Sequence, residues 1–326
     1  VIKSLFLDKL WQEFETVKEN KNKLQKLHEK ISSLRFLDPA CGCGNFLVIT
    51  YRELRLLEIE ILKVLQQGQM VTNIESLIRI NVDKFYGIEI EEFPAQIAQV
   101  AMWLIDHQMN MLVHEVFGEY FLRLPLVKSP VILQGNALRI DWQSLLQSDS
   151  SIDLVAKHTN IFLFEEPSVA YKTVNVKTET FEIHKGKVPE TQPILFFNYI
   201  LGNPPFIGKQ HQNEEQKKDM DFIWMGVNGT GILDYVTCWY LKAARYIEKY
   251  SQQNNENNKI KVAFVSTNSI SQGEQVSVLW NELFYKYRIK IHFAHQTFGW
   301  TSEARGKAAV HVVIIGFSNF DTSKKY

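Results

Sequence analysis

The chain has 326 residues, of which 45% are hydrophobic and 22% charged, a balance typical of folded globular domains and not of disordered chains. Its 36 basic and 36 acidic side chains give a formal net charge of zero, whereas a domain that grips a phosphate backbone by itself usually carries a basic excess. Three cysteines are too few for a disulfide framework and favour a reduced, cytoplasmic protein. No run of about 18 apolar residues is present, so we expect no membrane span.

Taken in chain order, the apolar pattern predicts helices and strands that alternate through most of the chain. Residues 1–30 predict a helix, in which the charged stretch 18–30 forms a solvent-exposed face. The predicted strands are 34–38, 85–90, 131–134, 196–201, 262–266, 288–294 and 308–317, and the later predicted helices are 45–65, 94–111, 234–250 and 275–287. This order predicts an α/β fold with a doubly wound, mostly parallel sheet. The last two strands have no helix between them and are expected to give the sheet an antiparallel edge strand.

One stretch, residues 145–195, interrupts this alternation. Its segments Ile161–Glu166 and Thr173–Ile183 alternate in the manner of an inserted β-hairpin. We therefore divide the chain into an N-terminal helical segment at 1–33 and one α/β catalytic domain at 34–326 that contains the insertion. The sequence of the insertion indicates no function.

The first predicted strand runs into a glycine-rich turn, Asp38–Phe46, with the sequence D-P-A-C-G-C-G-N-F. Gly42 and Gly44 allow the backbone to turn sharply and to approach a ligand closely. Their spacing differs from the dinucleotide fingerprint, which argues against a nicotinamide cofactor. The second strand ends near Glu89, and a carboxylate at that position can accept hydrogen bonds from both hydroxyls of a ribose. The two strand ends together indicate a site for a ribose-containing ligand.

This glycine-rich turn resembles the first motif of amino-methyltransferases, usually D-P-A-C-G-S-G. The resemblance implies a class I, Rossmann-like methyltransferase fold with S-adenosylmethionine as cofactor. It also implies the residues that surround the cofactor: Asp38, Pro39, Ala40, Cys41, Gly42, Gly44, Asn45, Phe46, Glu89, Ile90, Asn136 and Ala137. In that arrangement Asp38 faces the cationic end of the cofactor, where a carboxylate is electrostatically favoured. Phe46 and Ile90 form apolar walls, and Asn136 stands where the family often has an aspartate that contacts the adenine amine.

Cys41 and Cys43 form a C-x-C pair that needs its own interpretation. Zinc sites with four ligands use other spacings, and Cys238 is remote in sequence with no cysteine or histidine cluster beside it. We therefore expect no metal, and we expect Cys41 and Cys43 to be small buried residues of a tight turn.

The most specific motif follows the fourth strand, at Asn203-Pro204-Pro205-Phe206. The exocyclic amine of adenine is a poor nucleophile because its lone pair is delocalised into the ring. The Asn203 side-chain oxygen and the Pro204 carbonyl could accept hydrogen bonds from that amine and so localise the lone pair. The two prolines hold this carbonyl rigidly, because each fixes its own φ. Phe206 would stack on the base, which must leave the double helix before its amine can be reached.

The order of the two motifs, with the cofactor turn first and N-P-P-F second, resembles the gamma class of N6-adenine DNA methyltransferases. Several segments are more similar still to the MmeI-like family of restriction-modification enzymes, among them G-I-E-I-E-E-F-P-A-Q-I-A, G-N-A-L-R-I-D-W and T-S-E-A-R-G-K-A-A-V-H-V-V-I-I-G-F. This resemblance implies a methyltransferase domain that acts on double-stranded DNA. It also implies a nuclease upstream and a target recognition domain downstream in the same polypeptide.

The segment Thr297–His311 lies between the last two strands and resembles the family's loop beside the flipped base. Phe298 and Trp300 are candidate stacking partners for DNA, and Arg305 and Lys307 are candidate phosphate contacts. The alternative is a β-hairpin in which the aromatic side chains only pack.

Three other functions fit part of the pattern. Methylation of protein glutamine at N5 also uses N-P-P and an aromatic residue, although that family generally has tyrosine there. Methylation of cytosine at N4 more often uses serine in place of Asn203. A scaffold that binds the cofactor and only presents DNA to a nuclease would need no catalytic motif, yet both motifs are complete.

Overall fold

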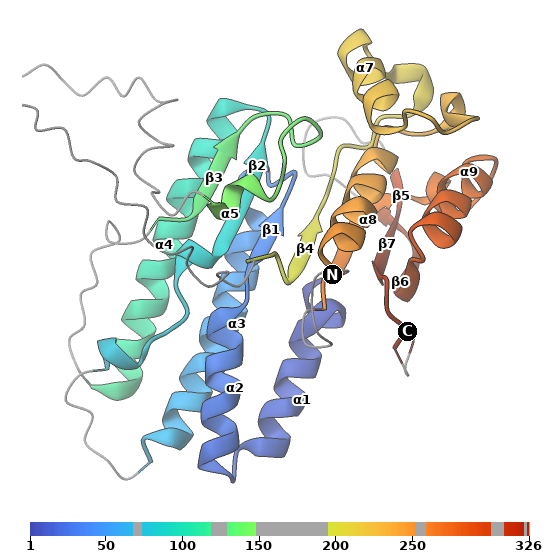
Figure 1. Cartoon of the computed structure of the whole chain (residues 1–326). Coiled ribbons are helices and arrows are strands. Elements are labelled where there is room, and N and C mark those ends of the chain that lie inside the picture. The colour runs from blue at the N-terminus through green and yellow to red at the C-terminus, as the bar shows by residue number, and fades with distance from the viewer. Residues whose placement is uncertain are drawn as a thin grey trace, which may run out of the picture.

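A sheet with the strand order β3-β2-β1-β4-β5-β7-β6 forms the centre of the protein (Figure 1). The computed structural model describes residues 1–67, 74–118, 129–147, 195–251, 259–300, 310–322 and 325. In these residues the strands are β1 (Phe36–Asp38), β2 (Phe85–Glu89), β3 (Val131–Gln134), β4 (Tyr199–Gly202), β5 (Lys261–Thr267), β6 (Lys290–Trp300) and β7 (Val310–Ser318). The first five strands pair in parallel, and β7 pairs antiparallel with both β5 and β6.

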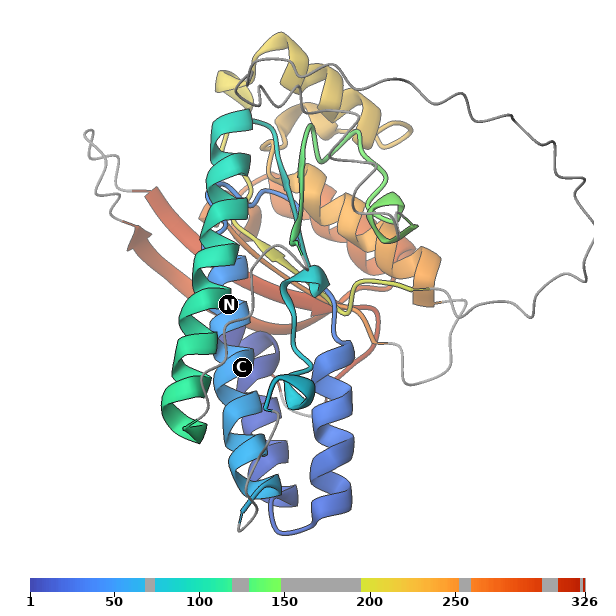
Figure 2. The same cartoon turned by 90° about the vertical axis from the view of Figure 1, so that its left-hand side faces the viewer.

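Helices cover both faces of this sheet. One side carries the N-terminal helices with α3 and α4, and the other carries α5 and α8, as the two perpendicular views show (Figure 2). The helices are η1 (Lys3–Leu7, a π-helix), α1 (Asp8–Val17), α2 (Lys21–Ser33), α3 (Asn45–Leu65), α4 (Glu92–Phe117), α5 (Ser144–Gln147), α7 (Glu214–Ile223), α8 (Thr237–Ser251), α9 (Gln275–Asn281) and η7 (Glu282–Lys286, a π-helix). None of the helices in the described ranges is both long enough and apolar enough to cross a bilayer.

The strands divide their side chains between two cores, one under each helical layer. Phe36 packs with the α1–α4 side, and the next residue, Leu37, packs with the α8 side. Ile200 and Leu201 of β4 alternate in the same way. Successive side chains of a strand point to opposite faces, and a sheet buried on both faces therefore needs continuous apolar runs. This requirement explains why the parallel strands are almost wholly apolar.

The sheet reverses its direction of winding between β1 and β4. The chain moves outward from β1 to β2 and β3, and it then returns to place β4 on the other side of β1. Ligands of open α/β sheets bind in the crevice outside the carboxyl ends of the strands at such a switch point. Both predicted motifs follow strands that border this point.

The structure confirms the doubly wound sheet with its antiparallel edge, and α3 has the predicted bounds. The fourth strand begins at Tyr199 and not at residue 196, because backbone groups before it bond to side chains and not to a neighbouring strand. The Phe197 N–H donates to Tyr246 Oη (3.0 Å), and the Leu195 carbonyl accepts from Gln143 Nε2 (2.6 Å). The predicted hairpin near 145–195 lies almost entirely outside the described residues.

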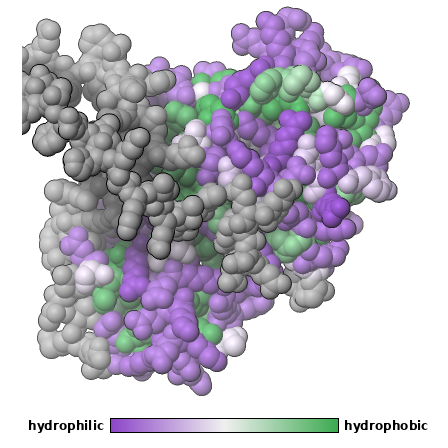
Figure 3. All heavy atoms as spheres, viewed as in Figure 1, coloured by the Kyte–Doolittle hydropathy of each residue, from purple (hydrophilic) through white to green (hydrophobic). Residues whose placement is uncertain are grey.

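The single helix predicted for residues 1–30 is wrong in one respect, because the chain breaks between α1 and α2. Asn20 caps α2 by accepting a hydrogen bond from the backbone N–H of Lys23 (3.1 Å). The lysines of α2 are exposed as predicted, while its apolar side Leu24, Leu27 and Ile31 is buried. The surface is accordingly mostly hydrophilic in the lower part of the molecule, where α1 and α2 lie (Figure 3).

Candidate cofactor and catalytic site

The glycine-rich loop between β1 and α3 forms a tight turn at the carboxyl end of β1. Gly42 and Gly44 have positive φ angles of 52° and 85°, which residues with a Cβ adopt only under strain. A Cβ on Gly44 would also lie 3.1 Å from the Cβ of Ala98 on α4. The backbone conformation itself therefore requires these two glycines.

Glu89 ends β2 and ties this loop to the neighbouring strand. Its carboxylate accepts hydrogen bonds from the backbone N–H groups of Gly42 (2.8 Å) and Glu91 (3.1 Å). A carboxylate offers about four lone-pair positions, so two positions are free to accept hydrogen bonds from a ligand. The bond to Gly42 gives Glu89 a structural role in the loop that the sequence did not indicate.

Asp38, the last residue of β1, is fully buried below the loop. Its Oδ1 accepts a hydrogen bond from the backbone N–H of Ala40 (3.1 Å), whereas its Oδ2 has no hydrogen-bond partner in the described chain. Burial raises the pKa of the Asp38 carboxyl to about 8. An unpartnered buried carboxylate oxygen is costly, and a donor or a positive charge close by would offset that cost.

A cavity of about 630 Å³ lies at the carboxyl ends of β1 to β4 and joins the two motifs. Its lining includes many of the residues predicted from the sequence, namely Pro39, Ala40, Gly42, Glu89, Ile90, Asn136, Ala137, Asn203 and Pro205. The other predicted residues, Asp38, Cys41, Gly44, Asn45, Phe46, Pro204 and Phe206, are not in that lining. A cavity bordered by both motifs can hold a ligand from the first motif within reach of a group held by the second.

Helix α7 forms a further wall of the cavity through Asp219, a residue that the sequence analysis missed. The Asp219 carboxylate accepts hydrogen bonds from Asn136 Nδ2 (2.8 Å), Arg139 Nε (2.6 Å) and Tyr235 Oη (2.7 Å). Asp219 is buried, and three donors satisfy its charge. It thereby holds the turn after β3 against α7.

Two side chains of α8 also shape the cavity walls without having been predicted. Trp239 donates its indole N–H to the carbonyl of Pro39 (3.0 Å) in the glycine-rich loop. The ammonium of Lys242 donates to the carbonyls of Ala137 (2.7 Å), Leu138 (2.9 Å) and Ile140 (2.6 Å) in the turn after β3. Burial lowers the pKa of Lys242 to about 8. Helix α8 therefore positions both loops that border the cavity.

The motif after β4 presents alternating exposed and buried residues. Asn203 and Pro205 are exposed, Pro204 is buried, and Phe206 is half-buried against the core on the α8 side. The Asn203 amide makes no hydrogen bond to any part of the chain that the structure describes. It is thus available to a ligand in the cavity that it borders.

Asp234 fixes the path of the chain just beyond this motif. Its carboxylate accepts hydrogen bonds from the backbone N–H of Lys209 (3.4 Å) and from the hydroxyls of Thr267 (3.3 Å) and Ser269. The side chain of Gln275 accepts the backbone N–H of Asp234 (2.9 Å). These contacts join the loop after β4 to the end of β5 and to α9.

The C-x-C pair differs from the prediction at one position. Cys41 is buried, and its Sγ would lie 2.8 Å from a Cβ at Gly87, so it fills space beside β2 as expected. Cys43 is exposed, which corrects the prediction that both cysteines are buried, because the positive φ angles on either side turn it outward. No group of three or more potential metal ligands occurs among the described side chains.

The four residues predicted to contact DNA belong to the end of β6 and to the segment that follows it. Arg305 and Lys307 lie outside the described residues, and of Phe298 and Trp300 only the backbone, in β6, is described. Their assignment to DNA stays a prediction.

A doubly wound sheet with this antiparallel edge, carrying both motifs at the carboxyl ends of its parallel strands, defines a class I methyltransferase. Residues 14–326 match the family described as MmeI, DNA-methyltransferase domain. The chain belongs to this family.

Two relatives extend the comparison. DNA methyltransferase A of Bacillus subtilis (strain 168) is 38% identical over 323 residues, which is 99% of this chain and 30% of the relative. The solved structure of the type IIL restriction-modification enzyme MmeI in complex with DNA is 51% identical with a TM-score of 0.79, and the match covers 99% of this chain and 36% of that one. The chain thus spans about a third of the length of these relatives.

Proposed function

We propose that the chain transfers the methyl group of S-adenosylmethionine to the N6 amine of adenine in double-stranded DNA, as the modification domain of a restriction-modification enzyme. The observation that carries this proposal is the cavity that Gly42, Glu89 and Asn203 line together. These residues come from the ends of three adjacent strands, so a cofactor held by the first two would lie beside the amide of the third.

The residues around the cavity suit this cofactor. Glu89 has free acceptor positions for ribose hydroxyls, and the exposed side chain of Ile90 offers an apolar surface to the adenine ring. The unpartnered oxygen of Asp38 lies below the loop, and burial raises the pKa of this carboxyl to about 8 in the ligand-free chain. A cationic ligand above it would favour the ionised form and offset the cost of burying that charge. When bound, S-adenosylmethionine supplies an electrophilic methyl group on a positively charged sulfur.

The chain's own part in the reaction is to orient the amine. The Asn203 side-chain oxygen and the Pro204 carbonyl would accept its two hydrogens, and the prolines keep these acceptors from reorganising. Phe206 would stack on the flipped base and return roughly 1–3 kcal/mol of the unstacking cost. The amine would then attack the methyl group directly, without a covalent intermediate on the protein. This attack would break the methyl–sulfur bond, release S-adenosylhomocysteine and set free one proton of the amine.

Glu89→Ala is expected to weaken S-adenosylmethionine binding by about 1.5–3 kcal/mol, the range for hydrogen bonds to a charged group. The variant loses the acceptor for the ribose and also the bond that holds Gly42. Calorimetric titration measures the change. Glu91→Ala is the matched control, because Glu91 is exposed and its side chain caps nothing in the structure. Equal affinity in both variants would show that Glu89 does not bind the ribose.

The pKa of Asp38 leads to a prediction about pH. Burial raises this pKa to about 8 from 3.8, so the folded chain binds a proton that the unfolded chain releases between these values. The stability of the ligand-free protein should therefore fall as pH rises through this window, by at most about 1.4 kcal/mol per pH unit from this group. Asp38→Asn does not titrate and should lose less stability between pH 5 and 8 than the native protein does. Urea unfolding of both at several pH values checks the difference, and parallel curves would contradict it.

Methyl-transfer assays on the complete polypeptide decide between the alternatives. With labelled S-adenosylmethionine and DNA, RNA or protein as acceptor, we expect label in DNA alone. Digestion to nucleosides should then give N6-methyladenine. N4-methylcytosine would reassign the base, label in glutamine would reassign the acceptor, and absence of transfer in any acceptor would favour a scaffold.

The domain arrangement belongs to the same proposal. We assign residues 1–33 to a helical segment and 34–326 to the catalytic domain, and we place a nuclease and a target recognition domain elsewhere in the polypeptide. The support is that two relatives are about three times as long as the region they share with this chain. We also place the protein in the cytoplasm, since its described cysteines are unpaired.

A further inference from the structure

The turn after β3 and helix α7 are joined by a pair of side chains, Asn136 and Asp219. Asn136 Nδ2 donates to Asp219 Oδ2 (2.8 Å), and both residues line the cavity. Asp219 is 4% exposed and also accepts from Arg139 Nε (2.6 Å) and from the Tyr235 hydroxyl (2.7 Å). A guanidinium beside a carboxyl favours its ionised form, which accepts hydrogen bonds and cannot donate them. Asp219 therefore requires the NH₂ side of the Asn136 amide.

The orientation of the Asn136 amide is fixed from two sides. Turning a side-chain amide over exchanges its donor for its acceptor. Here the backbone N–H of Leu138 donates to Asn136 Oδ1 (2.9 Å), while Asp219 accepts from Nδ2. An amide oxygen has two lone pairs, so Oδ1 can accept a second hydrogen bond from a ligand in the cavity.

The strand order places Asn136 on the side of Glu89 away from Asp38. Strand β2, which ends at Glu89, lies between β1, which ends at Asp38, and β3, which Asn136 follows. The Gly135 N–H donates to the Glu89 carbonyl (2.7 Å), so the turn after β3 lies directly beside Glu89. A ribose held by Glu89 carries the methionine sulfur on one side and the adenine on the other. With the charged sulfur toward Asp38, the adenine extends toward Asn136.

We infer that Asp219 is a positioning residue that makes the site select an aminopurine cofactor, an inference that rests on the proposed binding of S-adenosylmethionine. Asp219 fixes the Asn136 amide so that Oδ1 accepts a hydrogen bond from the adenine amine. A cofactor with a carbonyl oxygen in place of that amine would bring a second acceptor against Oδ1. Two acceptors without a hydrogen between them leave both unpaired, which disfavours binding of the deaminated cofactor.

The same contact explains why an amide and not an acid stands at position 136. A carboxylate there could also accept from the adenine amine, but it would lie within hydrogen-bond distance of the Asp219 carboxylate. Two carboxylates that share a site cannot both be ionised without a large cost. The residue types at positions 136 and 219 therefore depend on each other, and the pair needs one amide and one acid.

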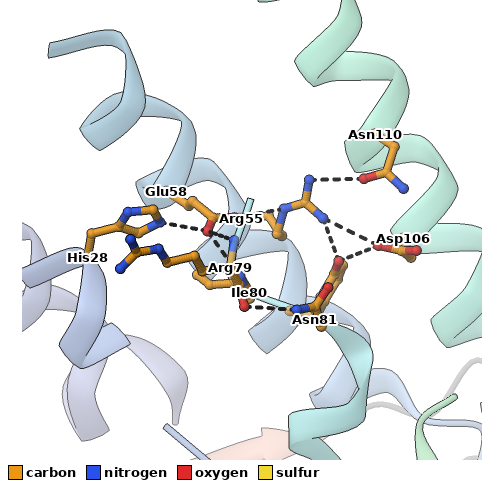
Figure 4. Close-up of polar contacts among 9 residues, drawn as sticks. His28, Arg55, Glu58, Arg79, Ile80, Asn81, Asp106 and Asn110 are labelled. Carbon is orange, nitrogen blue, oxygen red and sulfur yellow. Dashed lines mark hydrogen bonds and ion pairs between the residues drawn. The ribbon is translucent and has the colours of Figure 1, made fainter. Parts of the chain in front are cut away.

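A second buried polar network, between α3 and α4, offers a comparison (Figure 4). Arg55 of α3 is fully buried and donates to Asp106 Oδ1 (3.3 Å) and Asn110 Oδ1 (3.0 Å) of α4. Its Nε also lies 3.2 Å from Glu58 Oε2. None of these four residues lines the cavity. A variant of this network should therefore change stability without changing which cofactor is selected.

Calorimetric titration of the complete polypeptide with two ligands tests the inference. S-adenosylhomocysteine carries the adenine amine, and S-inosylhomocysteine carries a carbonyl oxygen in its place. We expect the native protein to bind the first at least about tenfold more tightly, the effect of one lost hydrogen bond and an unpaired acceptor. Asp219→Asn keeps the size of the side chain but no longer fixes the Asn136 amide, so this preference should fall to about threefold or less.

Three further variants separate positioning from stability. Asp221→Asn makes the same change at an exposed position of α7 and should leave the preference unchanged. Asp106→Asn should lower stability, measured by urea unfolding, and also leave the preference unchanged. The exchanged pair, Asn136→Asp with Asp219→Asn, should restore a preference of at least about tenfold, because a carboxylate at position 136 accepts and cannot donate. A purely structural role of Asp219 predicts no such rescue.

The native preference retained in Asp219→Asn would overturn the inference. So would tighter binding of S-inosylhomocysteine to the native protein, because Nδ2 of Asn136 would then face the base. An exchanged pair that binds both ligands equally would also overturn it. The titrations need no methyl transfer, so a protein that selects S-adenosylhomocysteine and methylates no acceptor would contradict the proposed function and support the role of Asp219.

Discussion

Asn203→Ala is expected to lower the rate of methyl transfer about 10²–10³-fold, the cost of losing one preorganised polar partner of a transition state. Affinity for S-adenosylmethionine should hardly change. The Asn203 side chain is exposed, borders the cavity and makes no hydrogen bond to the described residues. Its truncation therefore removes no hydrogen bond that supports the fold. Single-turnover kinetics and calorimetry on the complete polypeptide measure the two quantities separately.

Two further variants sharpen this test. Asn203→Asp keeps acceptor oxygens at the same place, so it should recover part of the rate if Asn203 accepts hydrogen bonds from the amine. Gln210→Ala, an exposed amide in the segment that follows the motif, should leave both quantities unchanged. Unaltered turnover in Asn203→Ala would remove Asn203 from the catalytic site.

Gly202→Ala is expected to destabilise the protein by about 1–3 kcal/mol, as overpacking of a core usually does. A Cβ at Gly202 would lie 2.5 Å from Asp38 Oδ1, and the Asp38 carboxyl cannot retreat because it is fully buried. Urea unfolding measures the loss of stability. Cofactor affinity should fall with it, because Asp38 is held directly below the glycine-rich loop. Gly231→Ala is the matched control, since a Cβ at Gly231 meets no atom within 4 Å.

A double variant distinguishes this clash with Asp38 from a general intolerance of β4 to substitution at Gly202. Asp38→Ala removes the atom that the new Cβ would strike, so Gly202→Ala should cost less in that background. The coupling free energy is expected to lie within about 0.5–3 kcal/mol, the range for residues in contact. Strictly additive effects would show that Gly202 is required for some reason other than Asp38.

Local patterns accounted for much of the fold. The apolar run of α3 predicted both its ends correctly, and the alternation of strands and helices predicted the sheet. Helix α7 could have been found as well, because Asn213 and Gln216 form the capping box that marks its start. Its short apolar face explains why periodicity alone missed it.

Contacts between distant residues account for what the sequence could not predict at the site. Asp219 lies 83 residues from Asn136, and Lys242 lies 105 residues from Ala137. Both side chains belong to helices whose patterns indicate only that one face is buried. The packing of the helices determines which polar atoms meet across the cavity. A short stretch of sequence does not indicate which distant residues that packing brings into contact. The two motifs were readable because their chemistry lies within a few consecutive residues.

The hydrogen bond from Trp239 to the carbonyl of Pro39 joins positions 200 residues apart. A ribosome adds about 5–20 residues per second, so the indole is synthesised about 10–40 s after the carbonyl that it holds. Strand β1 likewise lacks a neighbour until β4 has been synthesised, because Phe36 pairs with Tyr199. During this interval the nascent chain already carries the glycine-rich motif but lacks the contacts that shape it. Translation that stops before α8 should therefore leave a polypeptide that contains the binding motif and cannot bind.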